Sequence, residues 1–166
     1  MADDVLSLLK KPGHIAIARH ALAPGTGDPA NCTLEDCSTQ RNLSDEGRKQ
    51  AVKMGDLFRK AGIKDAAVYT SQWCRCRDTA TLMDLGAVTD FPAINSFFRR
   101  PEQRRTQMSE LRKWLKNPPK DKPIILITHH VVVTALTDIF PASGEILVLR
   151  QTDAGTWEVG GGVQTL

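Results

Sequence analysis

Two apolar runs in the chain have the pattern of buried β-strands. Residues 14–18 alternate small and β-branched side chains and lead into Arg19 and His20, and residues 124–128 are continuously apolar up to Thr128 and lead into His129. Such runs are typical of strands that are covered on both faces of a parallel sheet. Because open α/β sheets bind ligands outside the carboxyl ends of their strands, we expect both histidines at one edge of the sheet.

Helical and strand-like patterns alternate between and after these runs. Ser44 is placed to cap a helix that Gly62 ends. The remaining predicted helices cover about 74–85, 102–116 and 135–139, and the remaining predicted strands cover 66–70, 93–98, 145–150 and 157–159. This order predicts one domain over residues 1–166, a three-layer α/β/α fold with a mostly parallel central sheet and a final hairpin.

Composition narrows the classes of partner. The 166 residues have a formal net charge of +3, with 41% hydrophobic and 25% charged residues. This charge is too small to favour a nucleic-acid or membrane partner, and no apolar run is long enough to span a bilayer. Neither is therefore expected as a partner. The residues around the two histidines, and not the composition, indicate a small ligand, and the sequence leaves the oligomeric state open.

The residues around the two histidines suit phosphate chemistry. A neutral imidazole such as that of His20 can attack phosphorus directly, and arginine binds phosphate oxygens with a planar fork. Arg75 lies where the predicted 74–85 helix begins, close to a strand end, whereas Arg77 is expected on a solvated helix face. His129 would stabilise charge on the phosphoryl oxygens or assist proton transfer, and His130 would line the mouth of the pocket.

Four motifs in fixed order give the chain a family resemblance. They are Arg19-His20-Ala21, Leu43–Ala51 (LSDEGRKQA), Ser71–Ala80 (SQWCRCRDTA) and Thr128-His129-His130. Together they resemble the histidine phosphatase superfamily, the phosphoglycerate-mutase-like proteins. The resemblance implies a phosphorylated nucleophile at His20, a phosphate pocket completed by Arg19, Arg75 and His129, and no metal or other cofactor.

The chain departs from the family pattern at two positions. Ala21 replaces the glycine of the first motif, and no carboxylate stands near residues 94–96, where the family's acidic proton donor follows the third strand. The missing acid argues against mutase activity. Asp28, in the long loop over residues 21–43, and Glu102 are the candidates for the general acid, and Asp28 has the better location.

The resulting expectation is a metal-independent phosphomonoesterase. A non-catalytic phosphate-binding module and a phosphatase for phosphohistidine in proteins are the alternatives on the same fold. In the basic segment 99–105, one arginine could reach over the pocket and select a second anionic group, although a solvated helix start is the simpler interpretation.

The four cysteines, at positions 32, 37, 74 and 76, lack the spacing of a zinc site. Free thiols and disulfides are equally compatible with them. A bridge from Cys37 to Cys74 or Cys76 is plausible, because both segments should lie at the carboxyl edge of the sheet. Together with the resemblance of the chain to short exported family members, the cysteines favour a periplasmic or secreted location, with a cytoplasmic location as the alternative.

Overall fold

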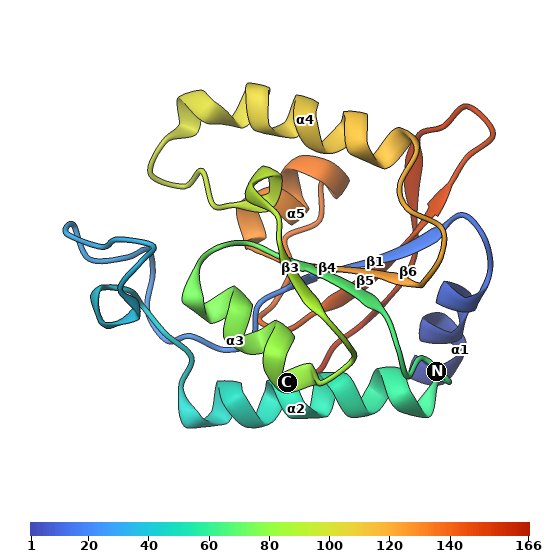
Figure 1. Ribbon diagram of the computed structural model, residues 1–166, viewed down its shortest axis with the longest axis horizontal. Helices are drawn as coiled ribbons and strands as arrows, with labels where there is room; N and C mark the ends of the chain where they lie inside the picture. The colour runs from blue at the N-terminus through green and yellow to red at the C-terminus, as the bar shows by residue number, and fades with distance from the viewer.

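The computed structural model describes residues 1–166 and contains one six-stranded sheet (Figure 1). The spatial order is β3-β2-β4-β1-β5-β6. The strands are β1 (His14–Arg19), β2 (Ala67–Thr70), β3 (Val88–Asp90), β4 (Ile124–Thr128), β5 (Ile146–Gln151) and β6 (Trp157–Val163). Strands β1 to β4 run parallel to one another, and β5 runs antiparallel to both β1 and β6. The predicted α/β class and the terminal hairpin are confirmed.

Helices cover both faces of this sheet (Figure 1). The α-helices are α1 (Ala2–Ser7), α2 (Asp45–Lys60), α3 (Cys74–Met83), α4 (Arg104–Lys116) and α5 (His130–Thr137). Short 3-10 turns lie at Leu8–Lys10, Cys37–Thr39, Pro92–Ile94 and Pro101–Gln103. Helices α1, α2 and α3 pack on one face, and α4 and α5 pack on the other. None of these helices has the length and apolar character needed to cross a membrane.

Strand β1 shows why the apolar runs have no polar face. Ala16 and Ala18 belong to the core under α2 and α3, while Ile15 and Ile17 belong to the core under α4 and α5. Side chains alternate across a strand, so a central strand between two helical layers needs apolar residues at every position. Because β1 and β4 are parallel neighbours with Arg19 opposite Thr128, their carboxyl ends lie side by side.

Four predicted elements differ clearly from the structure, one of them the last strand, which runs to Val163 and does not end at residue 159. The third strand is Val88–Asp90 and not residues 93–98, because the segment after it forms a 3-10 turn that begins at Pro92. Helix α3 ends at Met83, because Asp84 after it adopts the left-handed conformation, and so the helix does not extend to Leu85 as predicted. Helix α5 begins at His130, earlier than expected, and α1 was not predicted.

The loop over residues 21–43 begins at a point of close contact with α2. Ser44 caps this helix by accepting a hydrogen bond from the Gly47 N–H at 3.1 Å, as predicted. A Cβ atom at Gly47 would lie 2.0 Å from the carbonyl oxygen of Leu22, so a side chain here would push the loop away. Gln50 of the same helix accepts a hydrogen bond from the Leu22 N–H at 2.8 Å. The second motif therefore holds the start of the loop in place.

Candidate active site

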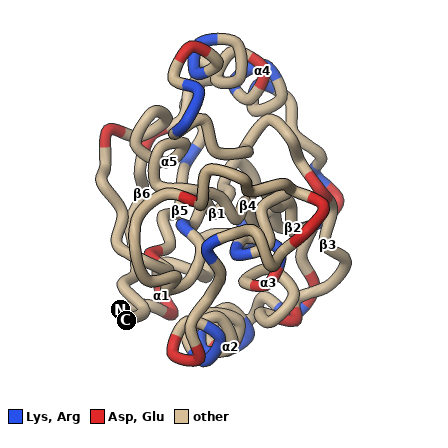
Figure 2. Tube along the Cα trace, turned by 90° about the vertical axis from the view of Figure 1, so that its left-hand side faces the viewer, with Lys and Arg blue, Asp and Glu red and all other residues tan.

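A cavity of about 690 Å³ lies at the carboxyl ends of β1 and β4, beneath the 21–43 loop. Its lining includes five arginines and three histidines but a single carboxylate: Arg19, Arg41, Arg75, Arg99, Arg100, His20, His129, His130 and Asp28. Figure 2 looks at the molecule from the side of the loop and shows basic positions gathered in the middle of the view. The cavity therefore suits an anionic ligand.

His20 is buried, with 2% of its surface exposed, and its hydrogen bonds define its protonation. Nδ1 lies 2.7 Å from the carbonyl oxygen of Ala21, which can only accept, so Nδ1 carries the proton. Nε2 accepts a hydrogen bond from Nε of Arg75 at 3.2 Å. Burial and the positive charge of Arg75 both lower the pKa of His20 well below its usual value. The ring is thus neutral, and the lone pair of Nε2 points toward the arginine.

Arg75 lies in the first turn of α3 and is 3% exposed. Besides its bond to His20, it uses the other edge of its guanidinium to bind Asp28, with Nη1–Oδ1 at 2.8 Å and Nη2–Oδ2 at 3.2 Å. Arg77, two residues later, is outside the cavity and pairs with Asp90. The sequence position predicted this division between the two arginines.

Arg19 and His129 complete the ring of groups around His20. Nη1 of Arg19 donates to the carbonyl oxygen of Pro141 at 3.0 Å, while its buried Nε has no hydrogen-bond partner. A buried donor without a partner is costly unless a ligand completes it. His129 lies with its ring centroid 5.6 Å from that of His20, and its Nε2 is 2.8 Å from Oγ of Ser71. Burial, followed by the neighbouring His20 ring and the charge of Arg75, lowers the pKa of His129 well below its usual value.

Asp28 is held in the cavity as a carboxylate. In addition to Arg75, it accepts hydrogen bonds from the backbone N–H of Arg41 at 3.0 Å and from Nε1 of Trp73 at 3.1 Å. Burial alone would raise the pKa of Asp28, but the hydrogen bonds and charge of Arg75 outweigh burial, and the pKa is lowered. In this arrangement Asp28 has no proton to give to a leaving group.

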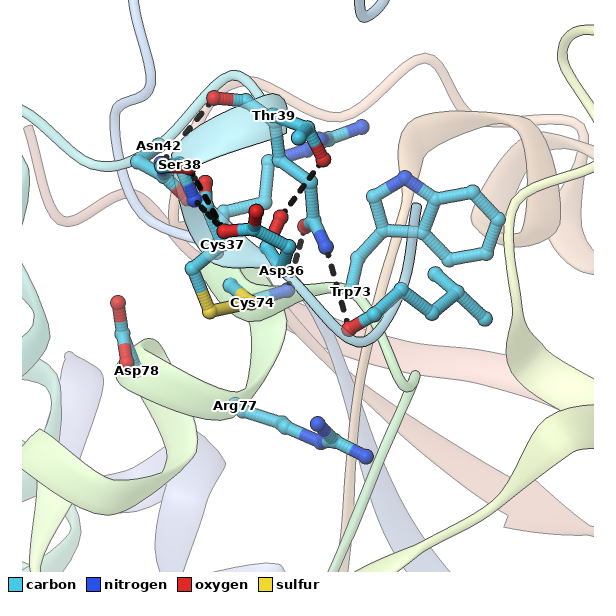
Figure 3. The surroundings of a disulfide bond; sticks show 12 residues. Asp36, Cys37, Ser38, Thr39, Asn42, Trp73, Cys74, Arg77 and Asp78 are labelled. Atoms are coloured by element: carbon cyan, nitrogen blue, oxygen red, sulfur yellow. Dashed lines mark hydrogen bonds between the residues drawn. A yellow bond between two sulfur atoms is a disulfide. The ribbon is translucent and has the colours of Figure 1, made fainter. Parts of the chain in front are cut away.

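The loop that carries Asp28 is tied to α3 by a disulfide (Figure 3). The bridge joins Cys37 to Cys74, the first residue of the helix, with a Cα–Cα distance of 5.8 Å. Oε1 of Gln40 also accepts a hydrogen bond from the Cys74 N–H at 2.9 Å. The base of the loop is therefore fixed beside Arg75, and of the two partners proposed for Cys37 the structure selects Cys74.

Of the two free cysteines, Cys32 lines the cavity with its Sγ 3.6 Å from Nη1 of Arg99, whereas Cys76 lacks the surroundings of a nucleophile. Cys76 is buried with Sγ 3.5 Å from Nε2 of His129, and burial raises the pKa of its thiol to about 12. A neutral, buried thiol is unreactive. Nowhere does the structure bring three or more His, Cys, Asp or Glu side chains into an arrangement that could hold a metal ion.

The cavity also contains residues that the sequence did not identify as part of the site. Arg41 and Trp73 line the cavity and contact Asp28, but nothing in their spacing identifies them. Arg99 also lines the cavity and donates a hydrogen bond to the backbone carbonyl of Asp28. One arginine of the segment 99–105 thus reaches the pocket, which the sequence indicated as a possibility. Glu102 is exposed and is absent from the lining, so Asp28 is the better placed of the two acid candidates.

Comparisons with known proteins concern the sequence pattern and the fold. Residues 15–91, a little under half of the chain, match the sequence model of the histidine phosphatase superfamily, branch 1. No curated protein matches the chain in sequence.

Solved structures share the fold at low sequence identity. The protein histidine phosphatase SixA in complex with tungstate superposes with a TM-score of 0.62 at 14% identity, over 92% of this chain and 97% of that one. Rv3214 from Mycobacterium tuberculosis superposes with a TM-score of 0.67 at 15% identity, over 94% and 98%. Mycobacterial glucosyl-3-phosphoglycerate phosphatase gives 0.60 at 15%, over 89% and 96%. The sequence match over residues 15–91 and the shared fold both agree with the resemblance of the chain to the histidine phosphatase superfamily.

Proposed function

We propose that the protein is a metal-independent phosphomonoester hydrolase that works through a phosphohistidine at His20. The observation that supports this most directly is the state of the ring. His20 is neutral, carries its proton on Nδ1, and presents the lone pair of Nε2 inside a cavity lined by arginines. This is the form in which an imidazole is a nucleophile.

The reaction would proceed in two displacements. Nε2 of His20 forms a bond to phosphorus while the bond from phosphorus to the ester oxygen breaks, and the alcohol leaves with a proton from a general acid. Water then attacks phosphorus, the P–N bond breaks, and inorganic phosphate is released. Arg19, Arg75 and His129 would bind the phosphoryl oxygens as their charge changes, which is electrostatic stabilisation by groups already in place.

Asp28 is the residue we propose as the acid. It is the only carboxylate that lines the cavity, and it lies on Arg75, where the phosphate is expected. A bound phosphate dianion would take the arginine away from Asp28 and add negative charge beside it. Both changes favour protonation of a carboxylate. The carboxyl would then hold the proton that the leaving group needs.

A small phosphomonoester is the substrate class that fits the covered cavity, and the ring of arginines and the match of residues 15–91 to the histidine phosphatase superfamily both support it. The alternative of a phosphatase for phosphohistidine in proteins draws on the fold shared with SixA, whose own description is protein histidine phosphatase. Against that alternative, the 21–43 loop overhangs the cavity and leaves less room for a protein surface. We also propose an oxidising compartment, periplasmic or secreted, because the Cys37–Cys74 bridge persists there.

Trapping the intermediate tests the mechanism. The protein, treated with excess EDTA, is mixed with a radiolabelled aryl phosphate and quenched. We expect a label on the protein that is lost in acid and kept in base, and equal turnover with or without EDTA. His20→Ala should remove the label and lower turnover more than about a hundredfold while the protein stays folded. A dependence on added zinc or magnesium, or turnover by His20→Ala above about a hundredth of normal, contradicts the proposal.

A further inference from the structure

Both edges of the Arg75 guanidinium are occupied in the structure. Nε points at Nε2 of His20 at 3.2 Å, and the Nη1/Nη2 edge binds the two oxygens of Asp28. The first contact covers the lone pair that would attack phosphorus. The second fills the two-pronged edge with which arginine binds a phosphate. The nucleophile and the phosphate ligand are therefore both engaged by protein groups.

Asp28 and a phosphate would compete for this edge. The pair is almost fully buried, with 4% of the Arg75 side chain and 7% of the Asp28 side chain exposed. Two separate anions cannot both use the same pair of N–H groups, and in a buried site their repulsion is poorly screened. Phosphate binding thus requires the carboxylate to give up the arginine.

The loop is built so that Asp28 can leave without the loop detaching. Its base is fixed by the Cys37–Cys74 bridge. The part that carries Asp28 is held by noncovalent contacts alone. The side chain of Arg41 donates to the carbonyls of Ala23 and Gly27, and Arg99 donates to the backbone carbonyl of Asp28. The Asp28 carboxylate also accepts from the Arg41 N–H and from Trp73. A displaced Asp28 would remain close to the cavity.

We propose that Asp28 is an internal competing anion, which occupies the phosphate-binding edge of Arg75 and keeps that arginine over the nucleophile until a tetrahedral oxyanion displaces it. This inference rests on the proposed function, since it assumes that Arg75 binds the substrate phosphate. It assigns Asp28 a second role beside that of the acid: Asp28 weakens the binding of phosphate-like anions and keeps the resting site closed.

Binding of tungstate, measured by isothermal titration calorimetry, tests the competition without any chemistry. Asp28→Asn keeps the size of the side chain and removes the charge, and it should bind tungstate at least about tenfold more tightly than the unaltered protein, a difference of about 1.4 kcal/mol. Asp90→Asn is the matched control, because the two oxygens of Asp90 bind Nε and Nη2 of Arg77 outside the cavity. It should leave the tungstate affinity unchanged. Equal or weaker binding by Asp28→Asn overturns the proposal.

A second variant keeps the test decisive if Asp28→Asn does not fold. Trp73→Phe removes one donor to Asp28 and keeps the charge, so tungstate binding should tighten by a smaller factor of about two to five. Unchanged or weaker binding by Trp73→Phe, in the absence of a folded Asp28→Asn, also overturns the proposal.

The outcomes separate this inference from the proposed function. If the unaltered protein forms the phosphohistidine but Asp28→Asn gains no affinity, the competition alone is wrong. If Asp28→Asn gains affinity but no phosphohistidine forms, the competition stands and the proposed hydrolysis is wrong. If no form of the protein binds tungstate, both are wrong.

Discussion

The first turn of helix α3 carries two arginines, and each of them pairs with an aspartate from another part of the chain. Arg75 and Asp28 meet inside the cavity with almost no exposure of either side chain, and Arg77 and Asp90 meet on the surface with 39% and 45% exposed. In both pairs the guanidinium bonds two carboxylate oxygens. Arg75 binds through Nη1 and Nη2 and Arg77 through Nε and Nη2, and the main difference between the pairs is their exposure.

The difference shows that burial decides what such a pair can do. An exposed ion pair is screened by water and is worth about 0–1 kcal/mol, so exchange of its partner changes little. A buried pair has given up its hydration, so removing one partner leaves the other uncompensated. Arg75 can therefore respond to an arriving anion by exchanging Asp28 for it, while Arg77 only joins α3 to β3. Four predictions test this contrast, in order of decreasing effect.

The largest effect, on the free energy of unfolding, is expected from loss of the Cys37–Cys74 bridge, which ties the loop that carries Asp28 to α3. Cys37→Ser should lower the free energy of unfolding by about 3–4 kcal/mol, because the bridge closes a loop with a sequence separation of 37. Cys32→Ser, in the same loop but outside the bridge, is the control and should change it by less than about 0.5 kcal/mol. Urea denaturation measures both. A loss below about 1 kcal/mol in Cys37→Ser would show that the bridge does not constrain the unfolded chain.

The second-largest effect is expected when each of the two arginines is replaced by lysine and kcat/KM is compared. Arg75→Lys should lower kcat/KM by about 10–100-fold, or about 1.4–2.8 kcal/mol, because a point charge cannot replace a fork that binds two oxygens. Arg77→Lys, outside the cavity, should stay within about twofold of the unaltered protein. Steady-state kinetics with an aryl phosphate measure the ratio. The reverse pattern would mean that the phosphate lies on the outer side of α3.

Burial of His20 and His129 should make stability depend on pH. Burial, as the first cause, lowers the pKa of both rings in the folded protein, so the unfolded chain binds protons that the folded protein rejects. The stability is complete above the unfolded pKa of about 6.5 and falls below it, by up to about 1.4 kcal/mol per pH unit for each ring.

Urea denaturation between pH 7 and pH 5 measures this slope. His20→Asn and His129→Asn should each remove one ring's share, and the double variant should remove both. A slope that the double variant leaves unchanged would show that other groups cause it.

The smallest effect concerns the leaving group. Asp28→Asn should slow hydrolysis of an alkyl phosphate about tenfold more than that of an activated aryl phosphate, because only a basic leaving group needs the proton. Glu102→Gln, which changes an exposed carboxylate outside the cavity, should slow the two substrates equally or not at all. Relative rates on the two substrate types decide the matter. If Glu102→Gln alone shows the differential effect, the acid is Glu102.

The sequence predicted most of the fold because most helices and strands have a recognisable pattern in their own residues. Ser44 caps α2 as its position predicts, and the uninterrupted apolar run of β4 is buried at every position. The prediction of the third strand was wrong because this strand lacks such a pattern. Val88–Asp90 is short and exposed, so it has no apolar pattern to detect, whereas residues 93–98 have such a pattern because they pack under α4.

The sequence by itself determined the family motifs, the two strands that end in histidines, and the assignment of Arg75 rather than Arg77 to the pocket, since all of these depend on neighbouring residues. The tertiary structure alone decided which cysteine Cys37 binds, that Arg41 and Trp73 join the site, and that Asp28 lies on Arg75. These contacts join residues more than ten positions apart through a loop without periodic pattern. Local propensity cannot specify such contacts, because they form only when the sheet and α3 are already assembled.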